Sequence, residues 1–333
     1  MLLKSQILFE DTDIIVVYKP AGVATQTSKV GQPDMVSEVK NYLMKGNNAS
    51  CQPKNGARSM MPGKGSEPYL ALIHRLDQPV EGILVMAKTP VAAAHLNKQL
   101  TEHMMDKHYL AAVCGKAPCA SATVVDYLLK DEKTNLSRIV EQGTEGAKKA
   151  VLEFEVVHTV QRKDCNSDDA TGAEKEHILS LLDIHLITGR HHQIRVQMSG
   201  ANMPLLGDQK YGGDEVQRLS KALGIRTVAL CSNKLSFLHP ITEERLTFEV
   251  QPKGSWYRLF SYIRVNDVVP YRNCVTDKGQ YFRRMQKSGS IPGLTTEKSY
   301  VKINVVVFGV WLSLVERYVR DVEAACSNHV TPI

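Results

Sequence analysis

An aspartate lies in a short polar gap between two apolar runs of the sequence. The stretch ALIHRLDQPVEGILVMAKT, residues 71–89, places His74, Arg75 and Asp77 between the runs ALI and ILVMA. An aspartate at such a position is most often a turn residue whose carboxylate accepts backbone hydrogen bonds. The other interpretation is a catalytic carboxylate that acts as a nucleophile, a base or an electrostatic stabiliser. The residue types alone favour the turn.

A catalytic Asp77 would need a nearby cation, because burial raises the pKa of a carboxyl group. Arg75 is close in sequence, but it belongs to a loop of unknown shape. Arg195 is the better candidate. In a helix that begins near His191, it shares a face with His191 and His192. The alternative for Arg195 is a solvated surface arginine, which the spacing does not exclude.

Tyr109 is the third residue with two interpretations. It lies in HYLAAVCG, an apolar stretch typical of a strand, where an aromatic side chain usually packs in the core. This core role is the favoured one on residue type. The functional alternative is an aromatic face that stacks on a planar ligand such as a base.

Other residues are of types found in metal, phosphate or nucleophile sites, but their spacing does not match the known motifs. Three histidines lie near Asp183 without the spacing of a standard metal-ligand set, namely His185, His191 and His192. The glycines at 207–213 form neither common phosphate-binding motif, and the chain has no G-x-S-x-G. We therefore expect neither a metal nor a cofactor.

The elements that must position these residues are mostly strands. Alternating or β-branched apolar runs predict strands at residues 7–10, 14–18, 69–73, 83–87, 108–115, 124–131, 148–160 and 178–187, with a closing hairpin over 227–252. Helices are expected at 34–44, from Thr89-Pro90 to about 104, and within 188–200. Many strands without regular βαβ alternation predict an α+β fold.

Two segments stand apart from this pattern. Residues 45–68 are rich in Gly, Pro, Asn and Lys and are expected to form a flexible loop. After residue 255 the character changes, so we divide the chain into a catalytic domain, 1–255, and a C-terminal extension of unassigned role, 256–333. The apolar run INVVVFGVWLSLV in the extension is shorter than the roughly 20 residues that span a bilayer. No membrane association is expected.

The composition is that of a soluble globular protein, with 43% hydrophobic and 23% charged residues in 333. The net charge is +6, but residues 261–333 hold 10 Lys and Arg against 6 acidic residues, so global charge does not argue for nucleic acid. Seven cysteines without a C-x-x-C pair fit free thiols in a reducing cytoplasm. The first residues, MLLKSQILFEDTD, are too acidic for a signal peptide.

Taken in order, several segments resemble the RluA-type family of RNA pseudouridine synthases over residues 7–255. They are ILFEDTDIIVVYKPAGVAT, HRLDQPVEGILVMAKT, KHYLAAVCG, GAKKAVLEFEVV, TGRHHQIRVQMSG, PLLGDQKYGG and LSFLHPITEERLTFEV. HRLD followed by GRHHQIR and PLLGDQKYG is a specific combination. The resemblance implies a mixed, mainly antiparallel β-sheet with flanking helices. It implies no separate S4-type RNA-binding domain before the catalytic one.

The resemblance also implies roles for residues. Asp77 would be the essential carboxylate, Tyr109 the active-site aromatic residue, and Arg195 the salt-bridge partner of Asp77. Arg75 would fill the space that the target uridine leaves in its stack. The other candidate RNA contacts are Arg190, for a phosphate, His74 and His192. Departures from the usual pattern stand at His191, Gln78 and Glu81, and none removes a proposed catalytic group.

The implied reaction isomerises a uridine of rRNA or tRNA to pseudouridine after base flipping, in a monomeric cytoplasmic enzyme without a cofactor. Asp77 would either attack C1′ or remove the 2′ proton, and the sequence does not decide between these routes. One alternative is a non-catalytic RNA-binding or RNA-folding protein on the same scaffold. Another is an unrelated carboxylate-dependent hydrolase that uses Asp77 and His185.

Overall fold

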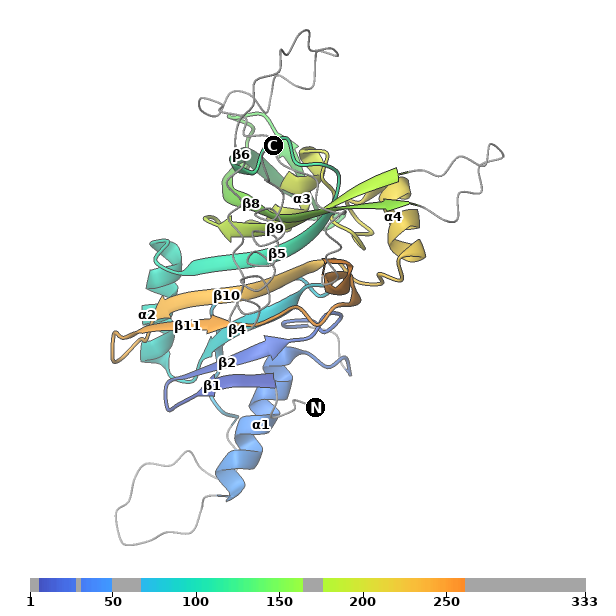
Figure 1. Cartoon of the computed structure of the whole chain (residues 1–333). Helices are drawn as coiled ribbons and strands as arrows, with labels where there is room; N and C mark the ends of the chain where they lie inside the picture. The colour runs from blue at the N-terminus through green and yellow to red at the C-terminus, as the bar shows by residue number, and fades with distance from the viewer. Residues whose placement is uncertain (1–5, 28–30, 50–66, 164–175, 261–333) are drawn as a thin grey trace, which may run out of the picture. The chain divides into compact units, whose positions relative to one another are not determined.

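The computed structural model of the chain describes residues 6–27, 31–49, 67–163 and 176–260 (Figure 1). The strands are β1 (Ile7–Glu10), β2 (Ile14–Lys19), β3 (Ala71–Leu72), β4 (Glu81–Ala87), β5 (Asp106–Cys114), β6 (Ser121–Asp131), β7 (Leu136–Val140), β8 (Lys148–Lys163), β9 (Glu176–Leu186), β10 (Leu230–Leu238) and β11 (Arg245–Glu249). The helices are α1 (Met35–Ala49), α2 (Pro90–Thr101), α3 (Gln193–Gly200), α4 (Gly213–Ala222) and the 3-10 helix η2 (Ser255–Phe260).

All these strands belong to one 11-stranded sheet in the order β1-β2-β4-β10-β5-β9-β8-β6-β7, with β3 on β4 and β11 on β10. Among the described strands, β4 and β10 are the single parallel pair. Every other described pair is antiparallel. The predicted α+β fold with a mixed, mainly antiparallel sheet is therefore confirmed.

The sheet carries a core on each face. In β2, Ile15 and Val17 contribute to a core shared with α1 and α3, whereas Ile14 and Val16 contribute to a core shared with α2. A third core under α4 and η2 covers the same face as α2, farther along the sheet. Since neighbouring residues of a strand point to opposite faces, burial on both sides explains why β2 is a continuous β-branched run.

The predicted helices are confirmed in part. Thr89 caps α2 as expected, because its Oγ1 accepts the Ala92 N–H at 3.2 Å. Helix α1 reaches Ala49, so residues 45–49 of the predicted loop are helical, and residues 50–66 lie outside the described residues. Glycine and asparagine lower helix propensity by about 1 kcal/mol or less, which a helix anchored in the core tolerates. Helix α4 and strand β7 were not predicted, because they contain few buried apolar residues.

The predicted extension begins inside the folded unit. Trp256 and Phe260 of η2 are buried in the core under α4, and Arg162 donates a hydrogen bond to the Leu259 carbonyl at 3.0 Å. Residues 261–333 lie outside the described residues. The division of the chain at 255 therefore stays a prediction.

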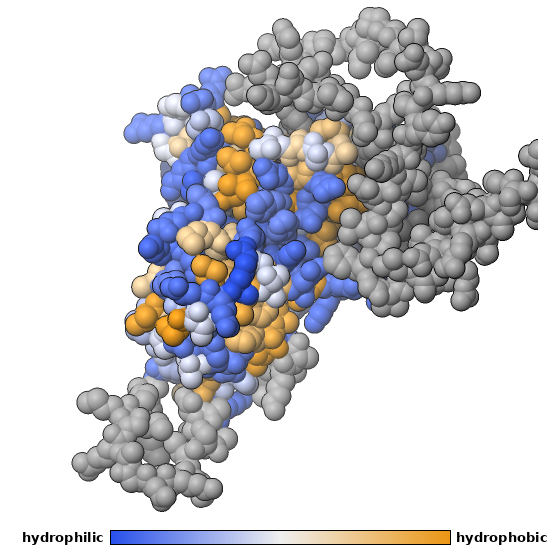
Figure 2. All heavy atoms as spheres, turned by 60° about the vertical axis from the view of Figure 1, so that its left-hand side comes forward, coloured by the Kyte–Doolittle hydropathy of each residue, from blue (hydrophilic) through white to orange (hydrophobic). Residues whose placement is uncertain are grey.

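Figure 2 shows a face on which hydrophilic side chains predominate and apolar ones form separate patches. The larger exposed apolar side chains of the described residues come from different elements; they include Val91, Val125, Val157 and Ile241. In the described ranges, no helix has the length and hydropathy needed to cross a bilayer.

The parallel contact between β4 and β10 depends on a glycine. Gly82 pairs with Ser232 and has a φ of +126°, and a Cβ added there would lie 2.3 Å from the Ser232 carbonyl oxygen. Beside it, Glu81 accepts hydrogen bonds from the Tyr18 hydroxyl and from the backbone N–H groups of Lys253 and Gly254. This junction joins the first and last parts of the described fold.

We predict that Gly82→Ala destabilises the protein by about 2–5 kcal/mol, because it adds a backbone clash to an unfavourable φ. Chemical denaturation measures the free energy of unfolding. Gly143→Ala is the matched control, since Gly143 also has a positive φ of +92° but has no atom within 4 Å of an added Cβ. Its cost should be about 1 kcal/mol. An equal loss of unfolding free energy in Gly82→Ala and Gly143→Ala would contradict a backbone clash at Gly82.

Candidate active site

The loop that carries Asp77 is held by the segment that follows β2. The Val80 N–H donates to the Asp77 carbonyl at 3.0 Å and closes the turn expected from the sequence. Thr25 Oγ1 donates to the Leu76 carbonyl at 2.7 Å and accepts the Leu76 N–H at 3.2 Å. The segment KPAGVAT therefore fixes the backbone on the N-terminal side of Asp77.

Lys19 holds the other side of this loop and was not predicted as a site residue. Its side chain is fully buried, and its Nζ donates to three backbone carbonyls, those of Val23 at 2.7 Å and of Pro20 and Gln78 at 3.1 Å. Burial lowers the pKa of Lys19 to about 7, against the opposing charges of Asp77 and Glu81. The sequence signal was the lysine before a proline at the end of an apolar strand.

Asp77 and Arg195 form the ion pair that the sequence suggested. Arg195 Nη1 donates to Asp77 Oδ2 at 2.9 Å. The Arg195 side chain is only 4% exposed, whereas that of Asp77 is 27% exposed. The predicted helix start near His191 was wrong. Helix α3 begins at Gln193, and His192, which precedes the helix, has a left-handed φ of 52°.

A second carboxylate fixes the guanidinium. Asp208 Oδ2 accepts from Arg195 Nε at 2.7 Å, and its Oδ1 accepts from Nη2 at 2.8 Å. The Lys210 and Tyr211 N–H groups also donate to Oδ1. Burial acts to raise the pKa of Asp208, but the hydrogen bonds and charge of Arg195 outweigh it and lower the pKa. Asp208 belongs to PLLGDQKYGG, a segment that carries the family resemblance but in which no site residue was predicted.

His192 also faces Asp77. Its Nε2 lies 3.5 Å from Asp77 Oδ2, and its Nδ1 lies 2.8 Å from the Tyr211 hydroxyl, which accepts the Ser137 N–H. Burial lowers the pKa of His192 to about 4, despite the opposing charge of Asp77. A neutral imidazole that accepts from Tyr211 at Nδ1 directs its Nε2–H toward Asp77, which satisfies both contacts.

Tyr109 lies on the same sheet face as these groups. It is 5% exposed and packs in the core shared with α1 and α3, so the core role favoured by its sequence context is borne out by its burial. Burial raises the pKa of Tyr109 to about 12; a hydrogen bond with Ser232 opposes this and the charge of Asp77 adds to it. The charge of Asp77 thus acts on the Tyr109 hydroxyl.

The other predicted contacts differ in exposure. Arg75 is exposed, and so is Arg190, whose Nε donates to the Lys149 carbonyl at 2.9 Å. His74 is half-buried, and its Nε2 accepts the Val85 N–H at 3.4 Å. Burial, with the charge of Lys107, lowers the pKa of His74 to about 3, so its imidazole is neutral.

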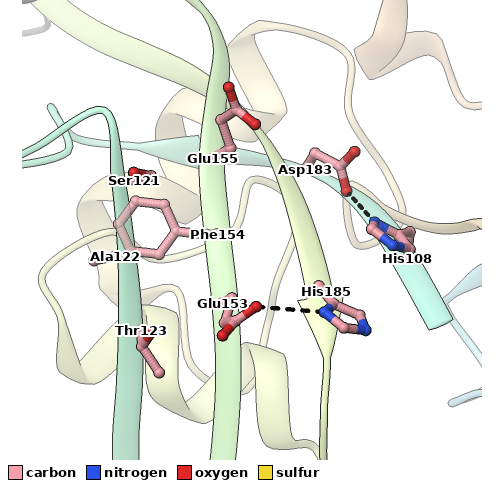
Figure 3. Close-up of a pocket in the computed structure, with 9 residues that line it drawn as sticks. All are labelled: His108, Ser121, Ala122, Thr123, Glu153, Phe154, Glu155, Asp183 and His185. Carbon is pink, nitrogen blue, oxygen red and sulfur yellow. Dashed lines mark hydrogen bonds and ion pairs between the residues drawn. The ribbon is translucent and has the colours of Figure 1, made fainter. Parts of the chain in front are cut away.

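His185 lies away from Asp77. It lines a hollow of about 400 Å³ on the sheet face opposite to Tyr109, where its Nδ1 contacts Glu153 at 3.4 Å (Figure 3). In the same hollow His108 contacts Asp183 at 3.0 Å. A hydrolase site built from Asp77 and His185 is therefore wrong. In the ranges that the structure describes, no three His, Cys, Asp or Glu side chains are arranged to hold a metal ion.

We predict that Asp208→Asn lowers the free energy of unfolding at neutral pH by about 3–5 kcal/mol, because it leaves the buried Arg195 under-compensated. The folded pKa of Asp208 is lowered, so its contribution is complete above the unfolded value of about 4 and is lost as the pH falls through the folded value. The difference in free energy of unfolding between the wild-type protein and Asp208→Asn should become smaller below pH 4. Denaturant titrations at several pH values measure it. Asp183→Asn, at a carboxylate 39% exposed, is the control. A difference in unfolding free energy that does not change with pH would contradict the stabilising role of the Asp208 charge.

Comparison with known proteins identifies the family. A family model described as RNA pseudouridylate synthase matches residues 13–200. The uncharacterized RNA pseudouridine synthase YhcT of Bacillus subtilis is 32% identical over 243 residues, which cover 73% of this chain and 67% of the relative. Ribosomal large subunit pseudouridine synthase D of Neisseria meningitidis serogroup B is 31% identical over 78% of this chain and 61% of its own length. The chain thus spans about two thirds of the length of these relatives.

The solved structure of human RNA pseudouridylate synthase domain containing 4 has the same fold. It matches with a TM-score of 0.54 and 22% identity, over 78% of this chain and 94% of the human one. The family model covers more than half of the chain, and the Bacillus relative matches 73% of it. The chain belongs to the family of RNA pseudouridylate synthases.

Proposed function

We propose that this chain, an RNA uridine isomerase by its family, uses Asp77 as the essential carboxylate. The observation that carries the proposal is the chain of contacts from Asp208 through Arg195 to Asp77. Both contacts to the Asp77 carboxylate, from Arg195 and His192, are made at Oδ2. Oδ1 has no hydrogen-bond or ion-pair partner among the described residues, and it is the oxygen offered to the substrate.

The reaction breaks the bond between N1 of uracil and C1′ of the ribose, turns the base and joins C5 to C1′. Asp77 Oδ1 either attacks C1′ or removes the 2′ proton. Both routes require a carboxylate that keeps its position while charge develops, which the preorganised donors of Arg195 and His192 support. Tyr109 is the aromatic group that contacts the uracil.

The target base must leave its stack before the reaction, at a cost of a few kcal/mol. Arg75 is exposed two residues before Asp77, which suits a side chain that fills the vacated space. The exposed Arg190 is proposed as a phosphate contact. His74, beside Arg75, and His192, two residues after Arg190, are proposed as further contacts to the RNA. These assignments, like the absence of a cofactor and a cytoplasmic monomer, stay predictions.

The proposed substrate is ribosomal RNA, because the Neisseria relative is named for the large ribosomal subunit. Transfer RNA is the other substrate that the sequence left open. Pseudouridine mapping of total RNA from cells with and without the gene should show the loss of one or a few ribosomal sites. Loss confined to transfer RNA would overturn the choice of substrate but leave the reaction in place.

We predict that Asp77→Asn lowers pseudouridine formation by at least about 10³-fold while the affinity for RNA changes little, because the amide keeps the shape but loses the charge and the nucleophilic oxygen. The measurement pairs single-turnover conversion of transcribed ribosomal RNA with a binding titration. Asp183→Asn, on the opposite face of the sheet, serves as the control and should keep full activity.

Two outcomes separate this proposal from a non-catalytic RNA-binding protein. Activity retained in the Asp77→Asn variant would remove Asp77 from the mechanism. No turnover by the wild-type protein, with RNA binding that is indifferent to Asp77, would favour the binding protein.

A further inference from the structure

Lys107 is a buried lysine that the proposed mechanism does not use. It lies two residues before Tyr109 on β5, so both side chains point to the same face of the sheet. The lysine is only 7% exposed and Tyr109 is 5% exposed. The lysine side chain therefore extends the surface that carries Tyr109.

Its ammonium lies beside the turn that leads to His192 and Arg195. A Cβ added to Gly189, in the turn before His192, would lie 3.8 Å from Lys107 Nζ. The charge of Lys107 also helps to lower the pKa of His74, which lies three residues before Asp77. The ammonium is thus next to TGRHHQIR, and its charge acts on the segment HRLD.

Lys107 has no hydrogen-bond or ion-pair partner among the residues that the structure describes. Lys19 makes the contrast clear, because it is also buried but donates to three carbonyls. Burial lowers the pKa of Lys107. An unpaired ammonium in such a place is costly. A ligand that supplies the anion would offset that cost.

We propose that Lys107 binds a phosphate of the RNA backbone beside the flipped uridine. The inference rests on the proposed function, which brings a polyanion to this face. An ammonium is a compact charge on a flexible stem and binds phosphate as a point charge.

The test measures the salt dependence of RNA binding. Lys107→Met is made in the Asp77→Asn protein, so that turnover does not complicate the titration, and the probe is unmodified transcribed ribosomal RNA. Loss of one phosphate contact should weaken binding about fivefold at 0.15 M salt and reduce the slope of log affinity against log salt by about 0.7–0.9. Lys107→Arg should keep most of the slope.

Lys98→Met is the control. Lys98 is an exposed residue of α2, the helix that covers the sheet face opposite to Tyr109. This variant removes the same charge and should leave the slope unchanged. An equal change of slope in both methionine variants would reveal a general charge effect and overturn the phosphate site.

Thermal unfolding without RNA separates binding from a structural role. Lys107→Met should keep or raise the Tm, since it removes an unpaired buried charge. A lower Tm with an unchanged salt slope would overturn the proposal and make Lys107 structural. If the Asp77→Asn parent binds no RNA at any salt, the proposed function fails together with it. Binding by the parent that Lys107→Met leaves unaltered contradicts the lysine site alone.

Discussion

Arg195 binds two carboxylates, one buried in the protein and one partly exposed to solvent. Asp208 is fully buried and occupies Nε and Nη2 of Arg195, which leaves Nη1 for the partly exposed Asp77. The guanidinium is a rigid planar fork, so fixing two of its nitrogens also fixes the third. The direction of the outer ion pair is thus determined from inside the protein. The outer carboxylate can meet a substrate without losing its orientation.

The rest of the fold brings the parts of this arrangement together. The loop of Asp77 is held by Lys19 and Thr25 from the end of β2. Arg195 follows the turn after β9, and Asp208 precedes α4. Each part is supported by backbone hydrogen bonds and by a core on one sheet face. Accurate placement therefore comes from rigid elements rather than from the loops themselves.

The strands were predictable because apolar periodicity is a local property. The role of the loop between them was not, since Asp77 makes the ordinary turn contact with Val80 whatever else it does. Arg195 was proposed from its spacing and from the family resemblance, although its partner lies 118 residues away. Lys19 and Asp208 were missed, because their functions depend on contacts that no short window contains. Helix α4 and strand β7 lack the apolar pattern that would have indicated them.

The place of β10 in the sheet has a consequence for synthesis on the ribosome. Strands β4 and β5 are neighbours in the sequence, yet β10 lies between them in the sheet. Until residues 230–238 have emerged, the nascent chain exposes two unpaired strand edges at its centre. Such long-range closure raises the contact order and slows folding. The edges of β4 and β5 are therefore expected to stay open to chaperones or to aggregation until β10, the tenth strand along the chain, has been made.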